Sequence, residues 1–329
     1  MSPLLTVTDL RVSFATDDGV VHAVDGVSFE VAPGEVVAIV GESGSGKSVT
    51  AQTLIGLTRA PNARISGSVN FDGAELTELS DADLRSIRGE HIAMVFQDPM
   101  TSLNPVYRVG DQIAEAIRAH RTVSKSEALS RAVELLRSVG IPNPERRVRD
   151  YPHEFSGGMR QRVMIAMALA LEPEVLIADE PTTALDVTIQ AQILRLLEAL
   201  NRGRNLSVVL ITHDLGIVAE LADRVVVMYA GHIVEDAPLD ELFYNPQHPY
   251  TWGLLGSIAR LDEPRPDRLT QIGGSPPSLL NPPTGCRFAP RCKYAFDKCT
   301  QPPTLESRTG NPAHLDRCWL TPAEKTELR

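Results

Sequence analysis

Hydrophobic and polar residues follow two different periods along the chain, and the change between them separates predicted strands from predicted helices. Residues 4–14 alternate between apolar and polar, which predicts a half-exposed strand, and residues 23–31 are typical of a second one. The uninterrupted apolar run at 36–40 predicts a buried parallel strand. A glycine-rich turn follows it directly, and residues 47–57 then have the pattern of a helix.

The middle of the chain has the helical period, with apolar residues three or four positions apart. The segments with this spacing are 111–120, 125–139 and 157–171. Short apolar runs that predict further strands return at 175–179, 207–212 and 225–229. Strands on both sides of a helical stretch indicate an α/β core with a helical insertion at about residues 100–170.

The last part of the chain has neither period. From about Pro249 the composition changes, and proline pairs at 276–277 and 282–283 interrupt any regular element. All four cysteines of the chain lie in this part. We therefore predict a small, irregular, Cys-rich C-terminal extension after the α/β core.

Charge and hydrophobicity narrow the classes of function. The net charge of −10 argues against general nucleic-acid binding, because proteins that follow a phosphate backbone carry a basic surface. The longest apolar run, 163–171, is much shorter than the roughly 20 residues of a membrane-spanning helix, and the N-terminus has no pattern of a secretory leader. We expect a cytoplasmic protein with reduced thiols, which acts at a membrane only through a partner.

The turn after the strand at 36–40 carries the motif G-x-x-x-x-G-K-[ST]. Its residues are Gly41, Glu42, Ser43, Gly44, Ser45, Gly46, Lys47 and Ser48. The glycines let the backbone present N–H groups to phosphate oxygens. We expect Lys47 to reach the β- and γ-phosphates and Ser48 to ligate Mg²⁺. A strand, this loop and a helix in sequence predict a P-loop that binds a nucleoside triphosphate.

A second candidate phosphate site opens the helix predicted at 157–171. Ser156, Gly157 and Gly158 place unpaired backbone N–H groups and the positive end of the helix dipole at one point. A simpler interpretation makes Ser156 the N-cap of the helix and no more. Two phosphate sites in one chain suggest an ATP molecule bound between two subunits.

Two carboxylates end the strand predicted at 175–179. We expect Asp179 to hold Mg²⁺ through water and Glu180 to orient or deprotonate the attacking water. An Asp-Glu pair after a strand also occurs in ordinary solvated turns. The pair is therefore informative mainly together with the two phosphate motifs.

Together these motifs resemble those of the ATP-binding cassette (ABC) ATPases, and the resemblance covers nearly all of the chain. It implies a P-loop NTPase core with an antiparallel β-subdomain and a helical subdomain. Segment 181–186 is similar to the family's D-loop, which implies that Asp186 contacts the opposite subunit. The resemblance also implies that Gln97 senses Mg²⁺ and the γ-phosphate, that His213 contacts the γ-phosphate, and that Ser156 belongs to the signature that caps the partner's ATP.

The resemblance further implies an aromatic residue near the N-terminus that stacks on adenine. Phe14 is the candidate, although it can equally be a core residue. The turn at 17–19 shifts the register, so His22 is the alternative.

Three longer segments are similar to the ATPases of the oligopeptide/dipeptide/nickel importers. They are residues 97–105, 248–255 and 275–283. The similarity implies an ABC ATPase domain at 1–258 and an importer-type extension at 259–329. It also implies ATP hydrolysis at the cytoplasmic face of a bacterial or archaeal membrane, where it powers uptake of di- or oligopeptides.

The same resemblance implies the partners. They are a paralogous ATPase subunit or a second copy of this chain, two transmembrane permease subunits and, indirectly, an extracytoplasmic substrate-binding protein. Nickel is the alternative cargo, because the ATPase does not touch what is transported. A soluble ABC ATPase of DNA repair or translation, or an exporter, fits less well, since the chain has one cassette and this particular extension.

The cysteines predict a metal site, because four cytosolic thiols that cluster at one end of a chain are typical of metal ligation. They are Cys286, Cys292, Cys299 and Cys318. Zinc sites of four cysteines usually show closely paired spacing, which is absent here. The wider gaps favour a [4Fe–4S] cluster over Zn²⁺, with Arg287, Arg291 and Lys293 nearby to offset its charge; the resemblance points the same way. Free cysteines in a loose tail remain the simplest alternative.

Overall fold

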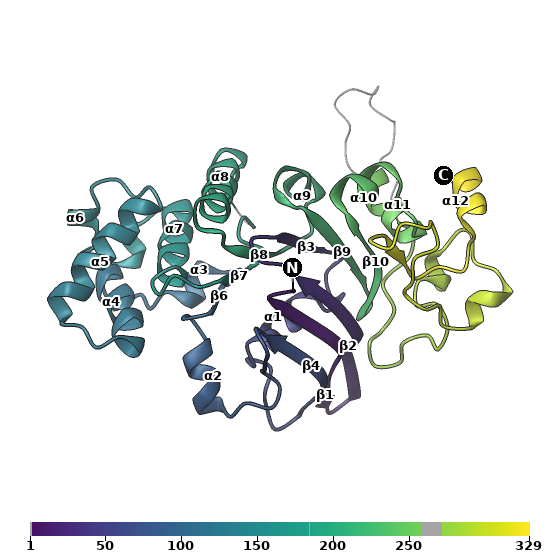
Figure 1. Ribbon diagram of the computed structural model, residues 1–329, viewed down its shortest axis with the longest axis horizontal. Coiled ribbons are helices and arrows are strands. Elements are labelled where there is room, and N and C mark those ends of the chain that lie inside the picture. The colour runs from purple at the N-terminus through teal and green to yellow at the C-terminus, as the bar shows by residue number, and fades with distance from the viewer. Residues whose placement is uncertain (1, 184, 258–271) are drawn as a thin grey trace. The chain divides into compact units, whose positions relative to one another are not determined.

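A strand, a glycine loop and a helix follow one another as the hydrophobic pattern predicts. In the computed structural model, strand β3 (Val36–Val40) is buried along its whole length and helix α1 (Lys47–Leu54) begins directly after the loop (Figure 1). Five successive apolar, mostly β-branched residues suit a strand that is covered on both faces. This arrangement fixes the place of the P-loop at the carboxyl end of β3.

The structure describes residues 2–183, 185–257 and 272–329. Within them the chain forms two compact units, one made of the residues up to Thr77 together with Thr212 to Arg329, the other of Glu78 to Ile211. The predicted boundary between residues 258 and 259 lies outside the described residues.

The first unit contains an antiparallel sheet of four strands in the order β2-β1-β4-β5. These strands are β1 (Leu5–Thr16), β2 (Gly19–Val31), β4 (Ala63–Phe71) and β5 (Ala74–Glu75). The hairpin of β1 and β2 pairs Leu5 with Val31 and Thr16 with Gly19. Its alternating pattern leaves one face buried and the other exposed, as the sequence predicts for residues 4–14.

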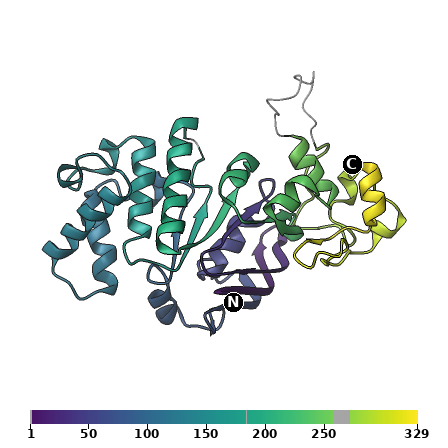
Figure 2. The ribbon, with the colours of Figure 1, turned by 45° about the horizontal axis from the view of Figure 1, so that its top comes forward.

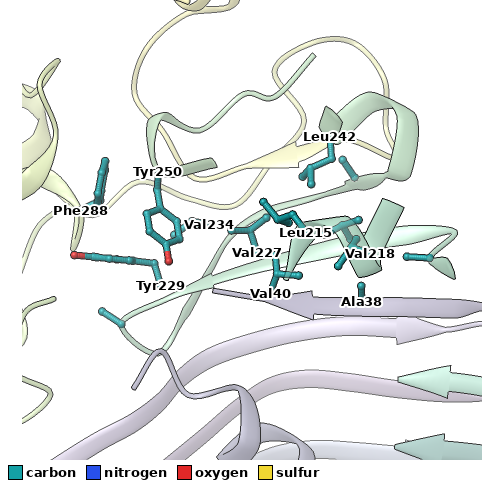
Figure 3. Close-up of a cluster of buried hydrophobic side chains, with 14 residues drawn as sticks. Ala38, Val40, Leu215, Val218, Val227, Tyr229, Val234, Leu242, Tyr250 and Phe288 are labelled. Carbon is teal, nitrogen blue, oxygen red and sulfur yellow. The ribbon is translucent and has the colours of Figure 1, made fainter. Parts of the chain in front are cut away.

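A second set of strands in this unit carries the P-loop. Strand β3 runs parallel to β9 (Arg224–Tyr229), β9 is antiparallel to β10 (His232–Pro238), and β10 is antiparallel to the short β11 (Leu315–Asp316). Buried side chains of β3, β9 and β10 form a hydrophobic cluster with helix α9 (Leu215–Leu221) (Figure 3). The cluster ends in three aromatic residues, Tyr229, Tyr250 and Phe288.

The C-terminal part of this unit consists of short elements. They are α10 (Leu239–Tyr244), α11 (Pro249–Gly256), the 3₁₀ turns η2 (Ala289–Arg291) and η3 (Asp297–Thr300), and α12 (Pro322–Leu328). Residues 272–329, drawn from light green to yellow, lie beside β10 and α11 in both views (Figures 1 and 2). We call residues 272–329 the extension.

The second unit contains parallel strands and most of the longer helices. Strand β7 (Val175–Asp179) pairs in parallel with β6 (Ile92–Val95) on one side and with β8 (Ser207–Thr212) on the other. The helices are α2 (Asp81–Ile87), α3 (Pro99–Ser102), α4 (Val109–His120), α5 (Lys125–Ser138), α6 (Pro144–Arg147), α7 (Gly157–Ala168) and α8 (Val187–Arg204), with the 3₁₀ turn η1 (Pro152–Glu154). Helices α4, α5 and α7 pack against one another (Figure 2).

The elements predicted from the pattern are all present, with ends that differ by a few residues. The helix predicted at 157–171 ends at Ala168, because Leu169 and the next residues form turns before Pro173. Helix α8 and strands β4, β6 and β10 were not predicted as elements. Among the described residues, no helix is both long enough and apolar enough to cross a membrane.

Candidate functional site

The P-loop is shaped by close backbone contacts. Gly41 has φ +152°, and a Cβ atom on it would lie 2.1 Å from the carbonyl oxygen of Met228 on β9. No side chain fits at that distance, so the loop can fold over β9 only with glycine at this position. Gly46 precedes α1 and Gly44 also has positive φ, which completes the tight turn.

Lys47 is folded into the loop, where only 6% of it is exposed. Its Nζ donates hydrogen bonds to the carbonyl oxygens of Gly41 at 2.7 Å and Glu42 at 3.0 Å. The hydroxyl of Ser45 is buried and has no hydrogen-bond partner among the described residues. A positive charge and an unsatisfied buried hydroxyl in one loop fit a phosphate group, because its oxygens accept from both. Ser43 is exposed and Ser48 is the second residue of α1.

Glu42 has contacts that the sequence analysis missed. Its backbone N–H donates to the hydroxyl of Tyr250, and its carboxylate accepts from both terminal nitrogens of Arg291. Tyr250 follows β10 by twelve residues and Arg291 lies in the extension. No local pattern connects residues so far apart in the chain, and the sequence points to Arg291 only as a cation beside the cysteines.

The second unit holds the carboxylates. Asp179 is the last residue of β7 and is buried, and Glu180 follows it with φ +46°. The Glu180 Oε2 accepts a hydrogen bond from Gln97 Nε2 at 3.0 Å and one from Thr183 Oγ1 at 2.7 Å. A non-glycine residue in the left-handed region costs of order 1 kcal/mol or more and is often found at functional sites. The structure thus brings Gln97 and Glu180 together, and Thr183 is a partner that the sequence analysis missed.

The predicted signature lies at the start of α7. Ser156 is the N-cap and accepts a hydrogen bond from the N–H of Met159, so the simpler interpretation of this serine holds as well. Gly157 is exposed and Gly158 is buried. A Cβ atom on Gly158 would lie 2.4 Å from Cγ2 of Ile189 on α8, so this position also needs glycine for packing. The exposed first turn can still offer N–H groups to an anion.

Asp186 is likewise an N-cap. Its carboxylate accepts a hydrogen bond from the N–H of Ile189 at 3.0 Å and begins α8. Ala184, in the middle of the predicted D-loop, lies outside the described residues. His213 is exposed directly after β8, and Asp214 caps α9 through the N–H groups of Gly216 and Ile217.

The two candidates for adenine stacking lie on the same hairpin. Phe14 is half-buried on β1, with Val21 of β2 as its Cα partner. His22 is exposed on β2, and its backbone N–H donates to the carbonyl oxygen of Leu279 in the extension. Both side chains therefore stay candidates for the contact with the base.

The four cysteines lie around one small cavity that is partly open to solvent. Cys286, Cys292, Cys299 and Cys318 line it together with the aromatic rings of Phe288, Tyr294, Phe296 and Trp319. Burial raises the pKa of the Cys292 thiol to about 11 and that of Cys318 to about 12. At neutral pH these two thiols are therefore protonated. Within the described residues, no group of three or more His, Cys, Asp or Glu is arranged to hold a metal ion.

Two of the cations predicted near the cysteines have carboxylate partners of their own. Arg287 bonds Asp25 and the carbonyl oxygen of Ala230, and Arg291 bonds Glu42, so their charges are balanced by carboxylates. That these two arginines also offset the charge of a cluster stays a prediction. Other cations act on the thiols: Arg317 opposes the rise in the pKa of Cys286, and Lys325 opposes that of Cys318, although burial outweighs both.

Comparison with known proteins identifies the family. The model for the ABC transporter family matches residues 24–183, and that for the C-terminal region of oligopeptide/dipeptide transporters matches residues 234–299. The chain is 54% identical over 320 residues to the oligopeptide transport ATP-binding protein OppD of Bacillus subtilis (strain 168), which covers 96% of this chain and 88% of that protein. It is 53% identical over 322 residues to the dipeptide transport ATP-binding protein DppD of the same organism, covering 97% and 95%.

A solved structure agrees with the fold. The dimeric ATP-binding cassette MJ0796, in a post-hydrolysis state bound to ADP and Pi, superposes with a TM-score of 0.65 at 29% identity, over 71% of this chain and 98% of that one. The expected P-loop fold with its mixed α/β sheets is confirmed. The chain belongs to the family of ABC ATPases that serve as the ATP-binding proteins of oligopeptide and dipeptide transporters.

Proposed function

We propose that this chain hydrolyses ATP to power the uptake of di- or oligopeptides through an ABC importer, with each ATP bound between the P-loop of one ATPase subunit and the signature of another. The names of the relatives, which are oligopeptide and dipeptide transport proteins, support a peptide cargo. So does the match of residues 234–299 to the C-terminal region of such transporters. The two helix N-termini at Lys47 and Gly157 support two phosphate contacts per chain.

The observation that carries the catalytic assignment is the position of Glu180. Two donors, Gln97 and Thr183, hold one oxygen of its carboxylate at the end of a buried strand, so the group is oriented before any substrate arrives. A carboxylate held in this way can orient a water molecule and accept its proton as the water attacks the γ-phosphate.

The P-loop supplies binding. On arrival of a triphosphate, Lys47 exchanges its bonds to the carbonyl oxygens of Gly41 and Glu42 for bonds to the β- and γ-phosphates. Ser48, Asp179 and Gln97 offer the oxygen atoms that Mg²⁺ prefers. When bound, Mg²⁺ neutralises charge that develops on the phosphate oxygens.

The partners follow from the same proposal. The second ATPase subunit is a paralogue or another copy of this chain, and both lie at the cytoplasmic face of the membrane beneath two permease subunits. Met100, Val106 and Tyr107 are exposed apolar residues in and just after the segment 97–105, which we assign to the contact with the permease. An extracytoplasmic binding protein delivers the peptide.

The test is a complex of this chain with its permease and partner ATPase in lipid vesicles. Adding the loaded binding protein with a di- or oligopeptide should stimulate ATP hydrolysis, and Lys47→Ala should abolish the response. Stimulation by Ni²⁺ with its binding protein, and none by peptides, would show that the cargo is nickel.

The cysteine cavity is assigned to a [4Fe–4S] cluster, with Zn²⁺ as the alternative. Four thiols around one cavity form a donor set of the right number and softness. The wide spacing of the cysteines along the chain favours the cluster, because zinc sites of four cysteines usually show closely paired spacing. Such ligation would order a segment with little regular structure.

Iron analysis tests this assignment. Protein purified without oxygen should be brown and contain about four irons per chain, and replacing Cys286, Cys292, Cys299 and Cys318 by serine, one at a time, should lower the iron content. Colourless protein with one zinc per chain would show that the cysteines bind Zn²⁺ and not a cluster. Protein with neither metal would leave four free thiols.

A further inference from the structure

Glu42 in the P-loop is held by a residue of the extension. The Nη1 and Nη2 atoms of Arg291 donate to its two carboxylate oxygens at 2.6 and 3.0 Å. The Arg291 side chain is 4% exposed and that of Glu42 is 29% exposed, so water screens this pair only in part. Paired, nearly parallel bonds of this kind are the strongest that an arginine forms with a carboxylate.

Arg291 is itself fixed on its other sides. Its Nε donates to the carbonyl oxygen of Gly273 and its Nη2 to that of Ile272, while the guanidinium lies 5.7 Å from the centre of the Tyr229 ring. A planar group with so many partners has one orientation available. Arg291 is therefore a rigid support for Glu42 rather than a mobile surface charge.

An aromatic residue also holds the backbone of Glu42. Tyr250, whose hydroxyl accepts the Glu42 N–H at 2.8 Å, packs with Tyr229 and Phe288, with ring centroids 4.6 to 5.4 Å apart (Figure 3). Cys286 and Cys292 pack against this same cluster. The rings thus connect the cysteine cavity to the loop through packed side chains.

Glu42 is in turn hydrogen-bonded to the phosphate-binding residues. Its carbonyl oxygen accepts from Nζ of Lys47 at 3.0 Å and from the N–H of Ser45 at 3.2 Å. Its carboxylate, N–H and carbonyl groups are thus all engaged, the first two by residues from outside the loop. A shift of the Glu42 peptide would therefore move the lysine and the N–H groups that receive the phosphates.

We propose that Arg291 is a positioning residue for the P-loop, and that through it the state of the cysteine cavity sets the affinity for ATP. Arg291 is the last residue of the turn η2 and Cys292 is the next residue, with Cys286 just before the turn. Fixing both sulfur atoms to a common group fixes the turn between them, and with it the guanidinium. This second step rests on the proposed metal site, whereas the first rests on contacts within the protein alone.

Titration of the full chain with a fluorescent ATP analogue tests the first step. Arg291→Ala should weaken binding by about tenfold, which corresponds to roughly 1.4 kcal/mol and lies near the low end for a charge-assisted hydrogen bond. Arg291→Lys should restore part of the affinity, and Glu42→Gln combined with Arg291→Ala should be no worse than Arg291→Ala alone. In the assembled transporter, KM for ATP should rise while kcat stays within about twofold.

A matched control comes from another shielded arginine of the extension. Arg308 bonds Thr304 and Asp316 and is 12% exposed, and these partners all lie in the extension. Arg308→Ala should lower the melting temperature but leave the affinity for ATP unchanged. Equal affinities for wild type and Arg291→Ala would overturn the proposal, and so would equal weakening by Arg291→Ala and Arg308→Ala.

The second step is tested by a double-mutant cycle with Cys292→Ser. If Arg291 transmits the state of the cavity, Cys292→Ser weakens ATP binding in the wild-type background and has little further effect in Arg291→Ala. Weakening of the same size in both backgrounds would refute transmission through Arg291. Iron is measured on each variant. Wild-type protein without metal would disprove the cluster, whereas the role of Arg291 at Glu42 is tested separately by the nucleotide titration.

Discussion

The ATP motifs and the extension are held in place by different forces. Around Glu180 and at the start of α7, the important groups are placed by nearby backbone: the end of strand β7 and the N-caps Ser156 and Asp186. The extension has little regular structure, and ion pairs between distant residues bind it to the rest of its unit. These pairs include Arg287 with Asp25 and Arg291 with Glu42.

This difference predicts how the ATP motifs and the extension respond to substitutions. A buried ion pair gives little net stability, but removing one partner leaves an uncompensated charge that is costly. A backbone-built site keeps its shape when a single side chain is changed without altering its volume. Substitutions that keep shape and volume in the ATP motifs should therefore act on activity, and substitutions in the extension on stability or, at Arg291, on affinity.

The largest effect is expected for Glu180→Gln. The amide has the same shape and leaves Gln97 and Thr183 in place, but it cannot take a proton from water. Turnover should fall by roughly 10²–10⁴-fold, while the affinity for ATP and the melting temperature stay close to those of the wild type. Steady-state hydrolysis together with nucleotide titration checks this. The control is Glu172→Gln at an exposed position. Near-normal hydrolysis by Glu180→Gln would show that Glu180 does not act on the attacking water.

The extension should respond in the opposite way to Lys325→Met. Lys325 and Asp316 form a 2.7 Å ion pair, and their side chains are 2% and 1% exposed. Removing the ammonium leaves a buried carboxylate whose pKa burial already raises and whose remaining cation, Arg308, lies 3.5 Å away. We therefore expect a loss of up to about 3 kcal/mol in the free energy of unfolding. Urea denaturation of the full chain measures it.

Lys293→Ala is the control for this loss. Lys293 is exposed in the same extension, so its removal should change stability by less than about 0.5 kcal/mol. If Lys325→Met were no less stable than Lys293→Ala, the loss of the ammonium would leave no costly buried charge at Asp316.

A smaller effect is expected for Gly158→Ala, which puts a methyl group 2.4 Å from Ile189 Cγ2. The backbone of α7 or α8 must shift, at a cost of about 1–3 kcal/mol. Gly203→Ala is the matched control, because its Cβ would meet no atom within 4 Å near the end of α8. Alanine there should raise stability by up to about 1 kcal/mol, as measured by thermal unfolding. Equal stabilities of the two variants would contradict the close packing at Gly158.

The same contrast explains what could be predicted from the sequence. Strand β3, the P-loop and α1 follow from a run of adjacent residues whose local preferences agree. The convergence of Gln97 and Glu180 could be expected only through the family resemblance, because it depends on the pairing of β6 with β7. The contact between Glu42 and Arg291 could not be predicted, since nothing in either segment specifies a partner 249 residues away.

For the cysteines, the sequence predicted one feature of the structure and missed another. Their concentration at one end of the chain predicted that they act together, and the structure places all four around one cavity. The carboxylate partners of Arg287 and Arg291, Asp25 and Glu42, could not be predicted, because they lie far away in the sequence. Thr183, three residues after Glu180, was within reach of sequence reasoning as a polar residue beside a carboxylate.

The smallest effect, at Asp186, separates a local role from a role between subunits. Its carboxylate caps α8 through the N–H of Ile189, and Asp186→Ala should cost about 0.5–2 kcal/mol in stability. Asparagine caps a helix nearly as well, so Asp186→Asn should keep the melting temperature of the wild type. If the cap is all that Asp186 provides, Asp186→Asn also keeps full ATPase activity in the assembled transporter. If its charge acts on the opposite subunit, as the resemblance of the D-loop implies, both variants lose activity alike, although only Asp186→Ala is less stable. Hydrolysis rates measured well below the melting temperatures distinguish the capping role from the role between subunits.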